Sequence, residues 1–396
     1  MKALTEEIVS GADTKPPRLL IADDQPAVLD ALRLLLKQEG YEIEAANSPA
    51  GVLASLEHGP FDALLMDLNY ARDTTSGEEG LDLVARVQEI DRTLPIVVMT
   101  AWSSVPVAVE AMRRGVRDFV EKPWNNDAVV RTLHQQVSNA REERRQRLLF
   151  EQEMALARET ERGLLPREVP QMPGYEIRGA WQPALTLGGD YFDARRLEDG
   201  LLALSIADVS GKGTSAALLV SNLQAAVRAS SRADVPPCEL CHGVNKLMRS
   251  NLGQDRFVTF FYALLDAPAR RLTYCNAGHN APILVRASGS VERLHRGGMV
   301  LGLAVEGRYE QDEVQLDPGD RLLLFTDGLT EANNAAGEEF GEDRLIEIAV
   351  RYRELSAEAL EEKVLGSAAA FTSGFTDDVT LVVVAATDDS RLPMGN

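Results

Sequence analysis

Short apolar runs alternate with amphipathic stretches over the first third of the chain. The runs have the length of buried strands and read RLLIADD, YEIEAAN, FDALLMDL, LPIVVMTA and RDFVEKPW. The stretches between them place apolar residues three or four positions apart, as helices do. A strand followed by a helix, repeated five times, predicts an α/β doubly wound fold in which helices cover both faces of a five-stranded parallel sheet.

Residues 126–165 have a different pattern, with no proline and a single glycine, Gly163. Apolar residues recur at a broken three-four spacing, and arginine and glutamate fill most of the other positions. This pattern predicts a long solvated helix with a thin apolar seam. A second helix would cover the seam, so we expect the segment to be a dimerising coiled coil. A rigid spacer helix without a partner is the alternative.

After Pro166 the chain contains many short apolar runs that read as antiparallel strands, joined in part by hairpin turns and interspersed with a few helices. This mixture predicts an α+β sandwich. We therefore divide the chain into a flexible tail at 1–16, an α/β domain at 17–125, a helical linker at 126–165, a sandwich domain at 166–387 and a tail at 388–396.

The charge balance excludes some kinds of partner. Lysine and arginine number 41 against 61 aspartates and glutamates, which gives a net charge of −20. We expect such a chain not to bind nucleic acid or anionic membranes. It has no run of 18 apolar residues, no secretory signal pattern at its start and three cysteines, so we expect a cytoplasmic protein.

Polar side chains follow the ends of the predicted parallel strands. Asp23 and Asp24 follow the first strand and Asp67 the third, while Thr100 and Lys122 end the fourth and fifth. The carboxyl ends of parallel strands meet at one edge of the sheet, so these side chains should converge. Three carboxylates together favour Mg²⁺. A lysine and a hydroxyl beside them can hold phosphoryl oxygens, and a carboxylate can itself accept a phosphoryl group.

This pattern resembles the response-regulator receiver domain, which has a flavodoxin-like fold, over residues 17–125. The resemblance implies that a sensor histidine kinase phosphorylates Asp67 and that Thr100 and Lys122 sense the phosphate. It also implies that Phe119 is the rotating aromatic of the family. The loop NYARDTTSGEEG is longer than usual and looks like that of receivers attached to transcriptional activators. The implied Mg²⁺ ligands are Asp23, Asp24, Asp67 and the backbone carbonyl of Asn69.

Four aspartate motifs in the last 210 or so residues form a second set of candidate ligands. They are GGDYFD at Asp190, ADVSGKG at Asp208, FTDGLTE at Asp327 and TDDVTLVVV at Asp377 and Asp378. Carboxylates at the ends of buried strands are costly unless they are paired or bind a metal. A site made of carboxylates alone prefers Mg²⁺ or Mn²⁺, and two such ions can activate a water for attack on phosphorus.

These motifs, together with AGHNAP at 277–282, GGMVLGL at 297–303 and ETERGLLP before the domain, resemble the SpoIIE/RsbU-type branch of the PPM (PP2C-like) serine/threonine phosphatases. The resemblance implies two Mn²⁺ or Mg²⁺ ions. Asp377 is preferred to Asp378 because the family ligand is the first residue of its pattern. The implied ligands are Asp190, Asp208, Asp327, Asp377 and the backbone carbonyl of Val209.

Together the two resemblances imply a two-component response regulator in which phosphorylation of Asp67 controls a metal-dependent protein serine/threonine phosphatase. The implied substrate is a phosphorylated anti-sigma-factor antagonist in a partner-switching pathway, and we expect the chain to form a homodimer. The alternative is a non-catalytic docking module with the same fold, whose assembly the receiver controls. The four aspartate motifs favour the enzyme, since a scaffold has no need of them.

Overall fold

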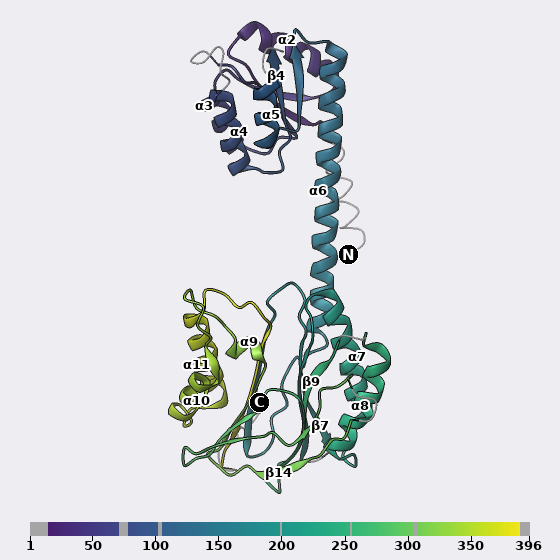
Figure 1. Ribbon diagram of the computed structural model, residues 1–396, viewed down its shortest axis with the longest axis vertical. Helices are drawn as coiled ribbons and strands as arrows, with labels where there is room; N and C mark the ends of the chain where they lie inside the picture. Colours follow the sequence, from purple (N-terminus) through teal and green to yellow (C-terminus); the bar gives the residue numbers. More distant parts are fainter. Residues whose placement is uncertain are drawn as a thin grey trace, which may run out of the picture. The chain divides into compact units, whose positions relative to one another are not determined.

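The computed structural model describes residues 15–70, 78–101, 105–198, 200–253, 256–303 and 307–388. The chain divides into two compact units, Met1–Gln152 and Glu153–Asn396 (Figure 1). Among the described residues, no helix combines the length and the apolar character that crossing a membrane requires.

The first unit is built around a parallel sheet of five strands in the order β2-β1-β3-β4-β5. Its buried side chains alternate between the two faces, with Leu20 and Leu64 in one apolar cluster and Leu19 and Leu65 in another. Helices pack on both clusters, so the predicted doubly wound fold is confirmed. The elements are β1 (Arg18–Ala22), α2 (Pro26–Gln38), β2 (Glu42–Ala46), α3 (Pro49–Glu57), β3 (Ala63–Asp67), α4 (Glu78–Ile90), β4 (Ile96–Ala101), α5 (Val105–Arg113) and β5 (Asp118–Lys122).

A single helix, α6 (Asn126–Arg162), follows this sheet and confirms the long helix predicted from the sequence. Its first turns belong to the core of the first unit, because Val129, Leu133 and Val137 are buried there. Arg141, one turn further on, makes two hydrogen bonds of 3.1 and 3.0 Å to the carboxylate of Asp62. The early part of the apolar seam is therefore used within the unit and is not available to a second helix.

The second unit is a sandwich of two largely antiparallel sheets. One has the order β13-β10-β9-β8-β7 with β14 beside β10, and the other has the order β12-β11-β15-β16-β6. Figure 1 shows α7 and α8 outside one sheet and α10 and α11 outside the other. The strands are β6 (Tyr175–Gln182), β7 (Asp190–Glu198), β8 (Leu201–Val209), β9 (Val258–Asp266), β10 (Arg271–Ala277), β11 (Ile283–Val285), β12 (Val291–Arg293), β13 (Gly297–Gly298), β14 (Asp312–Gln315), β15 (Arg321–Phe325) and β16 (Val379–Ala386).

Strand β15 shows how the two layers are filled. Leu322 and Leu324 point into the apolar cluster between the sheets, while Leu323 and Phe325 join the cluster under α10 and α11. A strand buried on both faces needs the continuous apolar run that the sequence has here. The predicted α+β sandwich is thus confirmed. Its helices are α7 (Thr214–Ser230), α8 (Pro237–Asn251), α9 (Asp327–Thr330), α10 (Gly341–Arg351) and α11 (Ala357–Phe371).

Candidate functional sites

The predicted acidic edge of the first sheet is present. Asp23, Asp24 and Asp67 each offer a carboxylate oxygen within 4.8 Å of the others, and within the described ranges no other group of three acidic, histidine or cysteine residues is as close. The ammonium group of Lys122 lies 2.7 Å from Asp23 Oδ2 and 2.8 Å from Asp67 Oδ2. Burial alone would lower the pKa of Lys122, but these two contacts raise it above its usual value, so the side chain remains charged.

The other predicted residues of this edge lie on strands β4 and β5 and just after β3. Thr100 follows Met99, which pairs with Asp67 across β3 and β4. Asn69 is half-buried two residues after Asp67. Phe119 is 47% exposed, so its ring is turned to solvent in this structure. Residues 71–77, most of the loop that resembles those of activator receivers, lie outside the described residues.

Tyr70 is a residue near this edge that the sequence reasoning missed. It is buried, and its hydroxyl has no hydrogen-bond partner among the described residues. Burial, followed by the charges of Asp67 and Asp23, raises the pKa of Tyr70 far above its normal value. The phenol therefore remains protonated beside the carboxylates and is available as a hydrogen-bond donor. No sequence motif pointed to it, since a tyrosine after a strand is usually part of the core.

In the second unit, strand pairing brings the first two aspartate motifs together. Asp190 begins β7 and lies directly opposite Asp208 near the end of β8. The Oδ2 atom of Asp190 accepts hydrogen bonds from the Thr326 hydroxyl at 2.7 Å and the Thr380 hydroxyl at 2.6 Å. Burial and then the charge of Asp208 raise the pKa of Asp190 well above its usual value. Two threonines that no motif had marked therefore fix the orientation of this carboxylate.

The remaining aspartates share the same electrostatic environment. Burial raises the pKa of Asp208 to about 7, with further contributions from Asp327 and Asp377. Burial and Asp377 also raise the pKa of Asp327. Lys212 supplies a positive charge, since its ammonium group lies 2.8 Å from Asp377 Oδ2. Carboxylates close enough to raise the pKa values of Asp208 and Asp327 form an all-oxygen donor set, which fits a hard divalent cation.

The structure distinguishes the roles of Asp377 and Asp378. Both carboxylate oxygens of Asp378 accept backbone N–H groups, from Ala184 at 2.7 Å and from Gly189 at 2.5 Å. Asp377, in contrast, keeps a partly exposed carboxylate that contacts Lys212 and its own neighbour's N–H. Asp378 therefore holds the backbone in place, while the carboxylate of Asp377 is the more accessible of the two.

Gly189 is required by close packing next to Asp190. A Cβ atom at this position would lie 2.9 Å from the carbonyl oxygen of Val209. The Gly189 carbonyl also accepts a hydrogen bond of 3.0 Å from the Val209 N–H. The glycine-rich motif thus lets the chain pass directly beside Val209, whose carbonyl is one of the implied metal ligands.

Glu161, near the end of α6, also lies beside this group, although no motif marked it as a site residue. It is 4% exposed, and burial, assisted by the charge of Asp378, raises its pKa to about 7. Its Oε1 atom accepts the Gly188 N–H at 3.0 Å. The contact joins residues 27 positions apart, which is why the sequence pattern did not reveal it.

His279 of the AGHNAP motif has a structural role next to the strand that carries Asp208. Its Nδ1 lies 2.8 Å from the Thr259 hydroxyl, and Asn276 binds both its backbone N–H and its carbonyl. Burial lowers the pKa of His279 to about 4, so the ring is neutral at pH 7. Since Thr259 pairs with Asp208 across β8 and β9, His279 supports the strand that carries that aspartate.

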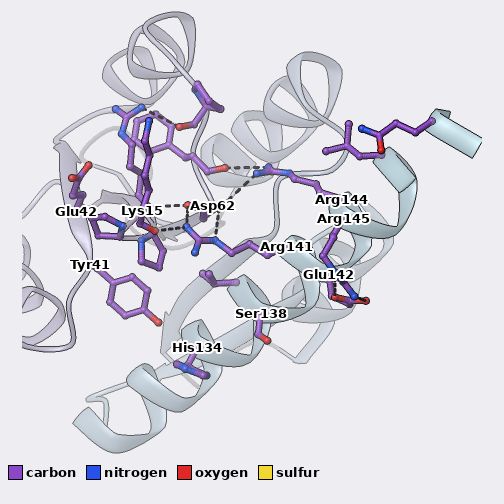
Figure 2. A pocket seen from close by; sticks show the side chains of 18 residues that line it. Lys15, Tyr41, Glu42, Asp62, His134, Ser138, Arg141, Glu142, Arg144 and Arg145 are labelled. Atoms are coloured by element: carbon purple, nitrogen blue, oxygen red, sulfur yellow. Dashed lines mark hydrogen bonds and ion pairs between the residues drawn. The ribbon is translucent and has the colours of Figure 1, made fainter. Parts of the chain in front are cut away.

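A groove of about 920 Å³ in the first unit is lined by several arginines of α6, but it contains none of the predicted site residues. Figure 2 shows Arg141 reaching Asp62, and Arg144 lies within 3.7 Å of the same carboxylate. Arg145 pairs with Glu142 in turn. These local pairs neutralise much of the positive charge, so the groove does not offer an evident anion site.

Comparison with known proteins agrees with this geometry. Residues 19–134 match the family described as response regulator receiver domain, and residues 198–387 match the family described as stage II sporulation protein E (SpoIIE). The chain joins a receiver domain to a SpoIIE-type PPM phosphatase domain. The receiver match contains Asp23, Asp24 and Asp67, and the SpoIIE match contains Asp208, Asp327 and Asp377.

Two curated relatives and one solved structure are similar to the SpoIIE-type part. Protein IcfG of Synechocystis is 28% identical over 222 residues, covering 49% of this chain and 35% of IcfG. Phosphoserine phosphatase RsbU of Bacillus subtilis is 30% identical over 186 residues, covering 47% of this chain and 55% of RsbU. The chain thus spans about a third and about half of the length of these relatives.

The solved SiaA-PP2C domain of Pseudomonas aeruginosa matches 61% of this chain and 98% of its own length, with a TM-score of 0.54 and 23% identity. This similarity concerns the fold. It supports the sandwich architecture of the second unit independently of the aspartate motifs.

Proposed function

We propose that this protein is a two-component response regulator whose output is the metal-dependent removal of phosphate from phosphoserine or phosphothreonine in a protein. The observation that carries the proposal is the grouping of Asp190, Asp208, Asp327 and Asp377. They come from separate elements, and, after burial, Asp208 raises the pKa of Asp190, Asp327 and Asp377 raise that of Asp208, and Asp377 raises that of Asp327. Three of them lie in the part of the chain that matches the SpoIIE family, and Asp190 lies just before it. A docking module would gain nothing from such a costly grouping.

In this proposal the phosphatase ions are two Mn²⁺ or Mg²⁺, held by Asp190, Asp208, Asp327, Asp377 and the backbone carbonyl of Val209. Such ions, when bound, supply an activated water and stabilise charge on the phosphoryl oxygens. The protein's own contribution is to orient the ligands. Two hydroxyl groups aim Asp190, and Lys212 fixes Asp377.

In the receiver, the proposed chemistry is phosphoryl transfer to Asp67. An oxygen of the Asp67 carboxylate forms a bond to phosphorus while the bond from phosphorus to the histidine nitrogen of a sensor kinase breaks. Lys122, already 2.8 Å from Asp67, and Thr100 on the next strand then hold the phosphoryl oxygens. The proposed Mg²⁺ ligands are Asp23, Asp24, Asp67 and the Asn69 carbonyl, in agreement with the acidic group described above.

The proposed substrate is a phosphorylated anti-sigma-factor antagonist, whose dephosphorylation would release a sigma factor by partner switching. Support comes from the similarity to RsbU, a protein named phosphoserine phosphatase. The most direct test is release of phosphate from a chromogenic aryl phosphate with Mn²⁺ and with EDTA. We expect turnover only with the metal. Phosphate release that is no faster with Mn²⁺ than with EDTA would favour the docking-module alternative.

We propose that α6 also pairs two chains. Leu148, Phe150 and Leu156 are more than half exposed on this helix, beyond the turns that are buried in the core of the first unit. Exposed apolar residues on a long helix favour a second helix as the partner. Light scattering at micromolar concentration is expected to give twice the chain mass of 43.3 kDa. A Leu148→Asp, Leu156→Asp double variant is expected to be monomeric. A wild-type protein that is monomeric both with and without beryllofluoride would rule out pairing.

Binding of Mn²⁺ to the phosphatase site is expected to weaken in acid. Because the pKa of Asp208 is raised to about 7 in the metal-free protein, its carboxyl group is largely protonated at pH 6. Metal binding must then displace that proton, so each pH unit below about 7 should weaken binding up to about tenfold. Isothermal titration calorimetry between pH 6 and pH 8 measures this. An affinity that does not change over that range would contradict the proposed role of Asp208.

A further inference from the structure

The end of the linker helix contacts the backbone that carries the first proposed phosphatase ligand. Glu161 Oε1 accepts the N–H of Gly188, two residues before Asp190, and the glutamate is almost fully buried. Its neighbours Thr160 and Arg162 are exposed, as is usual for such a charged helix. A glutamate is rarely buried without a specific partner, so this contact has a structural purpose.

The segment from Gly188 to Asp190 is held from two sides. Glu161 binds the N–H of Gly188, while Asp378 binds the N–H of Gly189. The Gly189 carbonyl in turn accepts the Val209 N–H at 3.0 Å. Two carboxylates on successive amides therefore fix the backbone that places both Asp190 and Val209.

A second contact, just after the end of α6, reaches β7. The Leu164 carbonyl accepts hydrogen bonds from Gln224 Nε2 at 2.6 Å and from Arg228 Nη2 at 3.4 Å. Arg228 also donates to Asp193 Oδ2 at 2.9 Å, and Asp193 lies on β7 three residues after Asp190. A displacement of this helix end would therefore act on Gly188, just before β7, and on Asp193 within β7.

We propose that Glu161 is a positioning residue through which the linker helix holds Asp190 and Val209 in the geometry that binds metal. The Oε2 atom of Glu161 has no partner within the described part of the chain, so a single hydrogen bond, accepted by Oε1 from the Gly188 N–H, makes the connection. A modest movement of the helix can break one such bond, which suits a regulated contact. This inference rests on the proposed function only for the role of the bound metal. The binding of the metal is tested separately.

The test measures Mn²⁺ binding to the full chain by isothermal titration calorimetry. Asp208→Asn protein, which keeps the receiver site, identifies the part of the signal that belongs to the phosphatase site. Glu161→Ala is expected to weaken that binding about tenfold, as loss of a group that orients metal ligands does. Glu161→Gln keeps an acceptor oxygen and is expected to stay within about threefold of wild type.

Glu176→Ala is the matched control, because the Glu176 carboxylate also accepts a backbone N–H, that of Ala357 at the start of α11. It should leave Mn²⁺ affinity unchanged. Thermal unfolding in EDTA shows that each variant is folded. The Gln variant serves as the test if the Ala variant does not fold, since an affinity of the Gln variant more than about threefold below that of the control would then contradict the proposal.

Several results would overturn the proposal. These are wild-type affinity in Glu161→Ala, an equal loss in Glu176→Ala, a loss in Glu161→Gln as large as in Glu161→Ala, or no phosphatase-site binding in the wild type. Failure of the proposed function gives a different result, namely a wild type that binds Mn²⁺ at the phosphatase site but releases no phosphate. The comparison of Glu161 variants would remain decisive in that case.

Discussion

Replacing Asp208 by asparagine is expected to lower kcat/KM for aryl phosphate hydrolysis by roughly 10³-fold, because a metal contributes several kcal/mol to transition-state stabilisation and each 1.36 kcal/mol is a factor of ten. Asp208 lies opposite Asp190 and is coupled electrostatically to Asp327 and Asp377. Asparagine has the shape of a protonated aspartic acid, so the fold should be retained while the ligand charge is lost. Initial rates with Mn²⁺ measure the effect.

Asp234→Asn is a suitable control for this variant. Asp234 belongs to the same unit, and its carboxylate is 74% exposed in a local pair with Arg232. The activity of Asp234→Asn should equal that of the wild type. Equal activity of Asp208→Asn and wild type would show that the grouped aspartates do not carry the reaction.

Replacing Asp67 by asparagine is expected to abolish phosphorylation of the receiver. Its carboxylate oxygen is the proposed nucleophile, and an amide oxygen cannot form the acyl phosphate. Incorporation of label from radioactive acetyl phosphate should fall to background, and any change in phosphatase rate caused by acetyl phosphate should disappear with it.

Asp82→Asn provides the comparison, since Asp82 lies in the same unit with a side chain that is 78% exposed. It should be labelled like the wild type. Continued labelling of Asp67→Asn at the wild-type level would place the phosphoryl group on another residue. The two variants together separate the acceptor from the aspartates that merely surround it.

Much of the acidic edge of the receiver could be predicted from the sequence, because a parallel sheet brings the ends of its strands to one side. Asp23, Asp67 and Lys122 each directly follow or end an apolar run, so the order of the strands sufficed to bring them together. The structure adds the contacts of 2.7 and 2.8 Å that Lys122 makes with the two carboxylates.

The phosphatase site could be predicted less completely from the sequence. Its aspartates could be identified from their glycine-flanked motifs, but the groups that orient them come from distant parts of the chain. Thr380 contacts Asp190 across 190 positions, and Lys212 contacts the Thr376 carbonyl across 164. A lysine or threonine has no sequence signature of such a role, because its partner is set only by the packing of the two sheets.

The structure of the helical linker could likewise be predicted only in part. Its length and apolar spacing predicted a long helix, and α6 spans Asn126–Arg162. The same spacing did not show that Val129 and Leu133 would be buried in the first unit, since a core helix and a paired helix both require apolar residues three or four apart. Burial of Glu161 could not be predicted either, as it depends on the position of Gly188.

The most direct test of the account is phosphate release from a phosphorylated anti-sigma-factor antagonist, with Mn²⁺ or EDTA and with or without beryllofluoride on the receiver. We predict release that requires Mn²⁺ and changes at least about fivefold, in either direction, when beryllofluoride binds, as coupling of 1 kcal/mol or more between two sites produces. Release that is unaffected by EDTA, or an identical rate with and without beryllofluoride, would contradict a metal-dependent phosphatase under receiver control.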